Sequence, residues 1–195
     1  MGLKVITPPT ALFTIATLRK WCKLSPDDSA HPDDALITDI ILPAAAAYAE
    51  QVNDRAYGSQ TLELALDEFP SQVAIALPRG PVTGITSVKY IDTLGAEITL
   101  DSSAYSLDDY SDPAWLTPAV NTDWPDTLAT VNAVKIRYVA GAAAVPATVA
   151  QAIAWLVGNG YENRQSASPG SWTELPIGVR AMLDTDRSYA RAGGA

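Results

Sequence analysis

Cysteine and histidine are almost absent from this chain of 195 residues, which contains one of each, Cys22 and His31. A single cysteine excludes an intrachain disulfide and a zinc site built from several cysteines, and it suits a reducing compartment. Cys22 follows Trp21 at the end of an apolar helical pattern, so we expect a buried thiol rather than a reactive one. His31 lies in the polar link 25–34 and is expected to be a solvated linker residue without a catalytic role.

Basic residues are also scarce, because 13 Lys and Arg stand against 22 Asp and Glu, a formal net charge of −9. Proteins that bind DNA without regard to sequence neutralise its phosphates with Lys and Arg, so this charge argues against that class. No apolar run approaches the roughly 18–20 residues that span a bilayer, and residues 1–9 lack the apolar core of a secretory signal. Glycine loops for phosphates and the G-x-S-x-G pattern are missing as well. We therefore expect a soluble protein with no cofactor, no metal site, no membrane contact and little catalytic equipment.

Apolar residues make up 48% of the chain, enough for a core, and their spacing changes twice. Up to Tyr57 they recur every three or four residues, which predicts a short helix near 12–22 and a longer one near 36–52, after an N-terminal arm. Pro43 should kink or divide the longer helix, and the alanine run 44–47 favours close packing between helices.

Between the two helical parts the spacing switches to every second residue, which predicts half-buried strands with one wet face. The alternating runs lie near residues 62–66, 73–77, 88–90, 98–100 and 134–138. Five short strands of this kind favour a small antiparallel sandwich or barrel. The stretch 101–130 is rich in Asp, Pro, Tyr and Trp, and is expected to be a long acidic loop that serves as a binding surface.

Helical spacing then returns, with helices expected near 146–161 and 176–183 before a short tail. The simplest fold is α+β: a bundle of about four helices, interrupted by an inserted small antiparallel β sandwich or barrel. The helical unit then comprises 1–57, including the N-terminal arm, and 142–195, whereas the insertion comprises 58–141. The two ends of such an insertion lie next to each other, which is how inserted domains are tolerated.

The charges are unevenly distributed along the chain. Between Lys89 and Lys135 there is no Lys or Arg, but there are eight acids: Asp92, Glu97, Asp101, Asp108, Asp109, Asp112, Asp123 and Asp126. Positive charge gathers in the last helices and the tail, at Arg164, Arg180, Arg187 and Arg191. One face or end of the β insertion should therefore be strongly negative, and the two ends of the molecule suit different partners.

Carboxylates and aromatic rings leave several interpretations open. Two groups of carboxylates stand out: Glu63 with Asp67, and Asp108 with Asp109 and Asp112. Such groups serve glycoside hydrolysis, hold a hard cation or form a solvated surface. Four aromatic residues share the acidic stretch: Tyr105, Tyr110, Trp115 and Trp124. Such rings bind sugars, anchor a loop or fill a subunit interface.

Six segments of the chain, taken together, resemble those of a known protein family. They are LKVITPP, YAEQVNDRAYGSQTLELALDEFP, LPRGPVTGITSVKYID, NAVKIRYVAG, VPATVAQAIAWLVGNGYENRQ and LPIGVRAMLDTDR. In this order they resemble the head–tail connector (adaptor) family of tailed bacteriophages, and most of all its longer branch with a β insertion, which is also found in prophages and gene transfer agents. The most distinctive pieces are residues 161–164 and 175–179. The chain departs from the family at Asn159-Gly160, where relatives often have His-Trp, and at Thr185-Asp186, where Pro-Tyr often precedes the arginine.

The resemblance implies a non-enzymatic structural protein of the virion neck, made in the host bacterial cytoplasm. Its relatives form a ring, a dodecamer, that joins the portal to a stopper or tail-completion protein. The genome passes through the central channel without specific binding, which agrees with an acidic lining that repels phosphates. The C-terminal segment of relatives typically docks on the portal.

Three sets of candidate residues follow from this resemblance. The portal-docking candidates are Arg180, Arg187, Arg191, Met182 and Leu183. The candidates for the subunit or tail-side interface are Trp115, Trp124 and Tyr110, beside the alanine run 44–47. The candidates for an acidic channel or surface are Asp108, Asp109 and Asp112. Two other functions stay open: a carbohydrate-binding or carboxylate-dependent hydrolase module, and a neck stopper or tail-completion protein.

Overall fold

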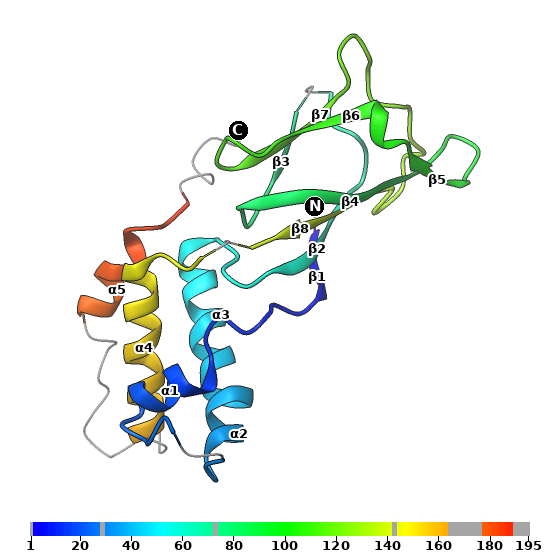
Figure 1. Ribbon diagram of the computed structural model, residues 1–195. Coiled ribbons are helices and arrows are strands. Elements are labelled where there is room, and N and C mark those ends of the chain that lie inside the picture. Colours follow the sequence, from blue (N-terminus) through cyan, green and yellow to red (C-terminus); the bar gives the residue numbers. More distant parts are fainter. Residues whose placement is uncertain (1, 28–29, 72–73, 142–143, 164–176, 189–195) are drawn as a thin grey trace, which may run out of the picture. The chain divides into compact units, whose positions relative to one another are not determined.

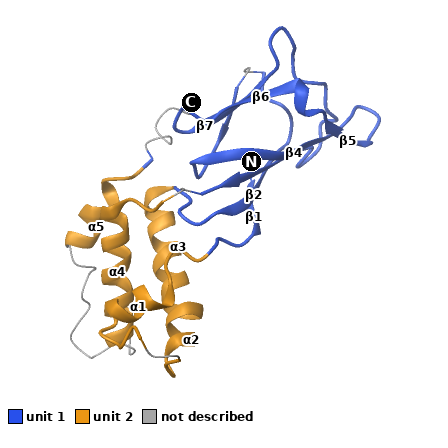
Figure 2. Ribbon diagram, viewed as in Figure 1, with its two compact units in different colours: residues 1–10, 55–143, 188–195 blue, residues 11–54, 144–187 orange. Residues whose placement is uncertain are grey.

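A computed structural model describes residues 2–27, 30–71, 74–141, 144–163 and 177–188 (Figure 1). The chain divides into two compact units (Figure 2). The β unit takes the described residues among 1–10, 55–143 and 188–195, and the helical unit takes those among 11–54 and 144–187. The helical part of the sequence is therefore interrupted by the β part, and the α+β fold class expected from the sequence is confirmed.

The β unit contains two antiparallel sheets. Its strands are β1 (Gly2–Thr7), β2 (Gln60–Leu66), β3 (Ile75–Leu77), β4 (Val82–Ile91), β5 (Glu97–Leu100), β6 (Tyr105–Asp108), β7 (Ala114–Pro118) and β8 (Val134–Ala140), and a 3-10 turn η2 (Ser102–Ala104) precedes β6. One sheet has the strand order β1-β2-β8-β4-β5 and the other has the order β3-β7-β6. Every strand pairing is antiparallel, as alternation with one wet face predicts.

Both sheets contribute to one hydrophobic core, which makes the β unit a sandwich. Leu64 on β2 lies opposite Ile136 on β8, which in turn lies opposite Val88 on β4, and all three side chains are fully buried. Leu77 on β3 and Leu116 on β7 fill the same core from the other sheet. The period-two pattern thus identifies the inward faces of β2, β4 and β8 correctly.

Three strands were not expected from the sequence. The N-terminal arm, grouped with the helices in the sequence interpretation, forms β1 and pairs with β2 from Gly2 opposite Ala65 to Thr7 opposite Thr61. The stretch 101–130, interpreted as a loop, contains the β6–β7 hairpin, in which Leu107 lies opposite Leu116. β1 has no buried residue, so no buried face marks it as a strand. β6 has four residues and β7 has five, and alternation over so few residues is hard to distinguish from the surrounding turn-forming Asp, Ser and Pro.

The helical unit is built from α1 (Ile15–Trp21), a long helix, α4 (Ala147–Glu162) and α5 (Ile177–Asp184). The long helix runs from Asp34 to Asn53 as α2 (Asp34–Leu36), a π-helical turn η1 (Ile37–Ile41) and α3 (Leu42–Asn53). α3 packs against α4, and both present buried side chains, among them Leu42, Ala49, Ile153 and Val157. These positions recur at helical spacing, which is why the sequence predicts both helices.

Pro43 explains the irregular turn in the long helix. Proline has no backbone N–H to donate and crowds the preceding turn, so a helix that contains it must adjust there. The structure places Pro43 in the first turn of α3, directly after the π-helical turn.

The long helix has 20 residues, and by length and composition alone it could cross a membrane, which the sequence pattern does not predict. Its buried Ile37 and Leu42 belong to the core of the helical unit.

A polar network joins α1, the start of the long helix and α4. Arg19 is only 3% exposed. It donates hydrogen bonds from Nε to Asp34 Oδ1 at 2.9 Å and from Nη2 to Asp34 Oδ2 at 2.5 Å. The backbone N–H of His31 also donates to Asp34 Oδ2, at 3.0 Å. Tyr161 on α4 donates its hydroxyl to Asp33 Oδ2 at 2.7 Å. These bonds hold the carboxylates at the start of the long helix, which also suits the helix dipole.

The Asp34 carboxylate makes the helical unit sensitive to acid. The hydrogen bond from Arg19, and then that from the His31 amide, lower the pKa of Asp34 from 3.8 to about 2. A carboxylate with a lowered folded-state pKa stabilises the fold above its unfolded pKa and loses that contribution as the pH falls towards the folded value. We expect Asp34→Asn to melt at a lower temperature than the parent protein at pH 6, and the two melting temperatures to converge as the pH falls from about 4 to about 2.

Thermal melts between pH 6 and pH 2, followed by circular dichroism, measure this convergence. Asp27→Asn is the matched control, because Asp27 is exposed and has no hydrogen-bond or ion-pair partner in the described part of the chain. A gap between Asp34→Asn and the parent that stays constant down to pH 2 would contradict the assignment.

Candidate interaction surfaces

Three acids of the base-free stretch hold turns of the β unit together. Asp92 accepts hydrogen bonds from two backbone amides of the β4–β5 turn, at 2.9 and 2.8 Å. Asp101 caps η2 by accepting from the amide and hydroxyl of Ser103, and these bonds lower the pKa of Asp101. Asp108 accepts from the Ser111 hydroxyl at 2.7 Å and from two amides in the β6–β7 turn, which lowers the pKa of Asp108. The positions of these three carboxylates therefore serve the fold.

Two further acids of the stretch are neutralised by cations. Glu97 lies 2.8 Å from the Lys89 ammonium and 3.6 Å from the Lys135 ammonium, and the hydrogen bond from Lys89 contributes most to lowering the pKa of Glu97. Asp112 forms an ion pair with Arg55, which lies before β2 in the chain. The pairings with Lys135 and Arg55 join segments distant in sequence. The gap in basic residues between Lys89 and Lys135 therefore overstates the local negative charge.

The remaining three acids, Asp109, Asp123 and Asp126, are exposed and have no hydrogen-bond or ion-pair partner among the described residues. The cluster Asp108, Asp109 and Asp112 is therefore not a single site, because its members have three different surroundings. Across the described part of the chain, no group of three or more His, Cys, Asp or Glu is arranged to hold a metal ion.

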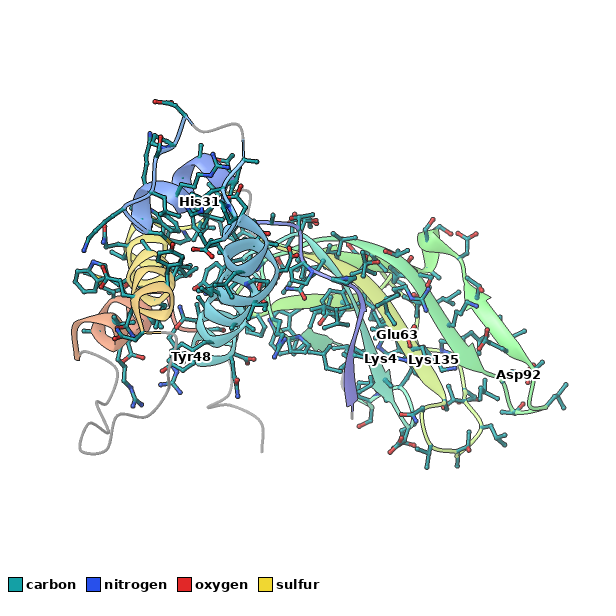
Figure 3. All side chains as sticks on the ribbon, turned by 90° about the horizontal axis from the view of Figure 1, so that it is seen from below. Lys4, His31, Tyr48, Glu63, Asp92 and Lys135 are labelled. Atoms are coloured by element: carbon teal, nitrogen blue, oxygen red, sulfur yellow. The ribbon has the colours of Figure 1, made fainter. Side chains whose placement is uncertain are left out.

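The pair Glu63 and Asp67 is likewise engaged elsewhere. Glu63 Oε2 lies 2.6 Å from Arg137 Nη2 on the neighbouring strand β8, and Asp67 accepts from the Asn132 amide at 2.9 Å. On the outer face of the five-stranded sheet, Lys4, Glu63 and Lys135 lie close together (Figure 3). Glu63 lies between Lys4 on β1 and Arg137 on β8 in the strand register, and both carboxylates of the pair have structural partners.

The aromatic candidates of the acidic stretch lie in different surroundings. Trp124 packs on the core with its ring stacked on Phe69, at 4.8 Å between centroids and 1° between planes. Trp115 is half-buried on β7 between the buried Ala114 and Leu116, so it points to the opposite face of that sheet. Tyr110, at the tip of the β6–β7 hairpin, is 99% exposed. The two tryptophans therefore do not form one flat platform for a sugar.

A cavity of about 360 Å³ opens beside Trp124. Its walls include the aromatic rings of Phe69 and Trp124, together with Pro70, Pro118 and Pro125. Its carboxylates are those of Glu68, Asp123 and Asp126, and the residues that line it include no Lys or Arg. Neither the cavity nor Glu68 was anticipated, because the sequence does not show that residues 68–71 and 118–127 meet.

The C-terminal candidates differ in exposure. Arg180 on α5 and Arg187 after it are exposed, and their side chains have no partner among the described residues. Met182 is half-buried, whereas Leu183 is fully buried in the helical unit and so supports α5 instead of offering a docking surface. Arg164 and Arg191 lie outside the described residues.

The remaining sequence candidates lie in the helical unit. Cys22 is 5% exposed, and burial raises the pKa of its thiol, as expected of a core cysteine. His31 is half-buried, and its Nδ1 accepts a hydrogen bond from the Asp33 amide at 3.2 Å, so it belongs to the helix start and is not a freely solvated linker residue.

The alanine run lies on α3, where Ala44 and Ala47 are exposed, and the preceding Ile40 is 62% exposed. This side of the long helix therefore exposes an apolar surface.

Solved structures of gene transfer agent particles contain chains with this architecture. A chain from the virion of a native gene transfer agent particle is 24% identical, with a TM-score of 0.78, and the match covers 100% of this chain and 99% of that one. The fold is shared from end to end. A chain from the neck of an empty particle, computed with C6 symmetry, is 26% identical with a TM-score of 0.77 over the same shares.

A chain from the neck of a native particle, computed with C12 symmetry, is 25% identical with a TM-score of 0.74, again over 100% and 99% of the two chains. No family model and no curated protein matches the sequence. The likeness is thus carried by three-dimensional structure, and it includes the helical unit and the β unit alike.

Proposed function

We propose that this protein is a structural component of the neck of a phage-like particle, where it forms a ring that joins the portal to the tail and lets DNA pass. One observation carries the proposal: the chain matches a neck chain of a gene transfer agent particle at 26% identity and a TM-score of 0.77, over 100% of one chain and 99% of the other. Because the match is end to end, the insertion of a β unit into a helical unit is common to both.

The charges of the β unit support a structural role over an enzymatic one. Among the carboxylates that the sequence offers as catalytic groups, all but Asp109 are held in turns, ion pairs or backbone hydrogen bonds. Carboxylates such as those of Asp108 and Asp109 repel the phosphates of DNA. DNA could therefore pass an acidic lining that contains them without adhering. A carbohydrate-binding function has weaker support, since Trp115 points away from the core on β7 whereas Trp124 packs against the core.

A ring of identical copies needs two different surfaces that meet, one from each neighbour. We assign one of them to the exposed side of the long helix, formed by Ile40, Ala44 and Ala47. The exposed Arg180 and Arg187 are the portal-docking residues, with Arg191 and the half-buried Met182 beside them in sequence. Tyr110 and Trp115 remain candidates for the tail-side interface.

Cryo-electron microscopy of particles made with and without this protein tests the proposal. We expect a ring of density below the portal that disappears when the gene is deleted, together with loss of tails from filled heads. Particles that keep this ring and their tails would contradict a neck role.

Binding to purified portal distinguishes a connector from a stopper. A connector binds portal rings directly in a pull-down, whereas a stopper or tail-completion protein binds only after another neck protein has joined the portal. The second result would move the protein one place further from the head and leave the neck role intact.

A further inference from the structure

The cavity beside Trp124 combines aromatic and proline side chains with negative charge. Phe69 and Trp124 stack in parallel at its side, and Pro118 belongs to the same lining. The carboxylates of Glu68, Asp123 and Asp126 come from two separate loops. A ligand that fits this surface carries positive charge and presents a flat or aliphatic part to the rings.

The carboxylates of the cavity differ from most acids nearby. Asp92, Asp101, Asp108 and Asp112 are engaged in turns or in an ion pair. Glu68, Asp123 and Asp126, by contrast, have no hydrogen-bond or ion-pair partner in the part of the chain that the structure describes. The unsatisfied negative charge of the β unit is therefore concentrated where the chain also forms a cavity.

The loop that forms one wall is held in place before any ligand arrives. The Leu128 amide donates to the Ile91 carbonyl and the Ala119 amide to the Ala104 carbonyl, at 3.0 and 2.9 Å. The stacked rings fix the loop between these two points. A preformed site loses less conformational freedom on binding than a mobile loop would.

We propose that this cavity receives an arginine side chain of a partner protein. A guanidinium group is planar, stacks on aromatic faces and forms paired hydrogen bonds with carboxylates, so it matches both the Trp124 wall and the acids. Charge complementarity favours this occupant over an acidic segment or DNA. The identity of the partner as another neck protein rests on the proposed function, but the chemistry of the cavity does not.

A titration with short peptides tests the cavity on the full-length protein. The probe is acetyl-Gly-Arg-Gly-Arg-Gly-amide, and the control peptide has citrulline, a neutral analogue of the same shape, in place of arginine. The readout is the indole N–H signal of Trp124 in nuclear magnetic resonance spectra, assigned by its loss in Trp124→Phe. We expect a saturable shift with the arginine peptide that weakens with added salt, and binding at least about fivefold weaker with citrulline.

A pair of charge-matched variants provides the control. Asp123→Asn with Asp126→Asn should weaken arginine-peptide binding by about fivefold or more, since two carboxylates of the cavity are lost. Asp27→Asn with Asp109→Asn removes the same charge from exposed acids that do not line the cavity, and should leave binding unchanged. No saturable shift, equal binding of citrulline, or equal loss in both variants would overturn the proposal.

Self-association is the competing outcome. If the Trp124 signal shifts on concentrating the protein alone, and Asp123→Asn with Asp126→Asn abolishes that shift, the cavity contacts a second copy and the assignment to another protein is wrong. The peptide experiment is independent of particle assembly, so its failure is distinguishable from failure to find a neck ring.

Discussion

Gly141→Ala is expected to unfold the β unit under conditions in which the parent protein is folded. Gly141 follows β8 with φ = 144°, a conformation that L side chains rarely adopt. A Cβ added there would lie 2.6 Å from the Ser59 Cα and 2.7 Å from the Gly58 carbonyl oxygen, both of which are backbone atoms that cannot turn aside. Strain and overpacking together should cost about 3 kcal/mol or more, a large part of the stability of a small domain.

Urea unfolding followed by circular dichroism measures this loss, and Gly84→Ala is the matched control. Gly84 lies within β4, in the same unit, and a Cβ added there meets nothing within 4 Å. We expect this control to change the free energy of unfolding by no more than about 1 kcal/mol. Replacing glycine with alanine lowers the conformational entropy of the unfolded chain, which favours a small stabilisation. Equal midpoints for the two variants would show that the crowding around Gly141 is relieved without cost.

Ala44→Glu combined with Ala47→Glu is expected to abolish ring assembly while leaving the protomer folded. Both alanines are exposed on α3, so the new side chains meet solvent in the isolated chain. In the proposed ring the same positions are covered by a neighbour, where unpaired carboxylates lose their hydration and repel each other around the ring. Ring formation should fall more than about tenfold, as measured by mass photometry with portal rings as template, because each interface loses at least about 1.4 kcal/mol.

Ala147→Glu with Gln151→Glu is the control for added charge. These positions are four residues apart, about one helical turn like Ala44 and Ala47, and they are exposed, but they lie on α4. Circular dichroism should report intact helices for both double variants. Normal rings from the α3 variant, or equal loss from both variants, would remove the exposed side of the long helix as the assigned interface.

The sequence predicts those elements whose hydrophobic pattern is long or deeply buried. Leu62 and Leu64 on β2 and Ile136 on β8 alternate clearly because one face of each strand is packed and the other is wet. β1 has the same alternation but lies at the edge of its sheet, where Leu3 and Val5 stay 38% and 43% exposed. An edge strand is recognised through its partner, and the pairing of residues 2–7 with 61–65 is not visible in a local pattern.

The candidate surfaces were predicted only in part, and for a similar reason. Composition identifies the stretch between Lys89 and Lys135 as acidic, but it does not show that Arg55 approaches Asp112 from another segment. It also does not show that Glu68 joins Asp123 and Asp126 around one cavity. Contacts of this kind depend on which loops the sheets bring together, so residue counts along the chain give the sign of a charge and not its environment.

The strand β1 has a consequence for anyone who wishes to divide this protein into modules. In sequence the β unit is an insertion, with Gln60 at the start of β2 opposite Ala140 at the end of β8, so the sequence suggests that one cut beyond each of these residues releases it. Its first strand, however, precedes the whole helical unit in the chain. A fragment of residues 55–141 would expose the edge of β2 and invite aggregation, whereas a fragment with residues 2–10 attached by a linker would keep that edge paired.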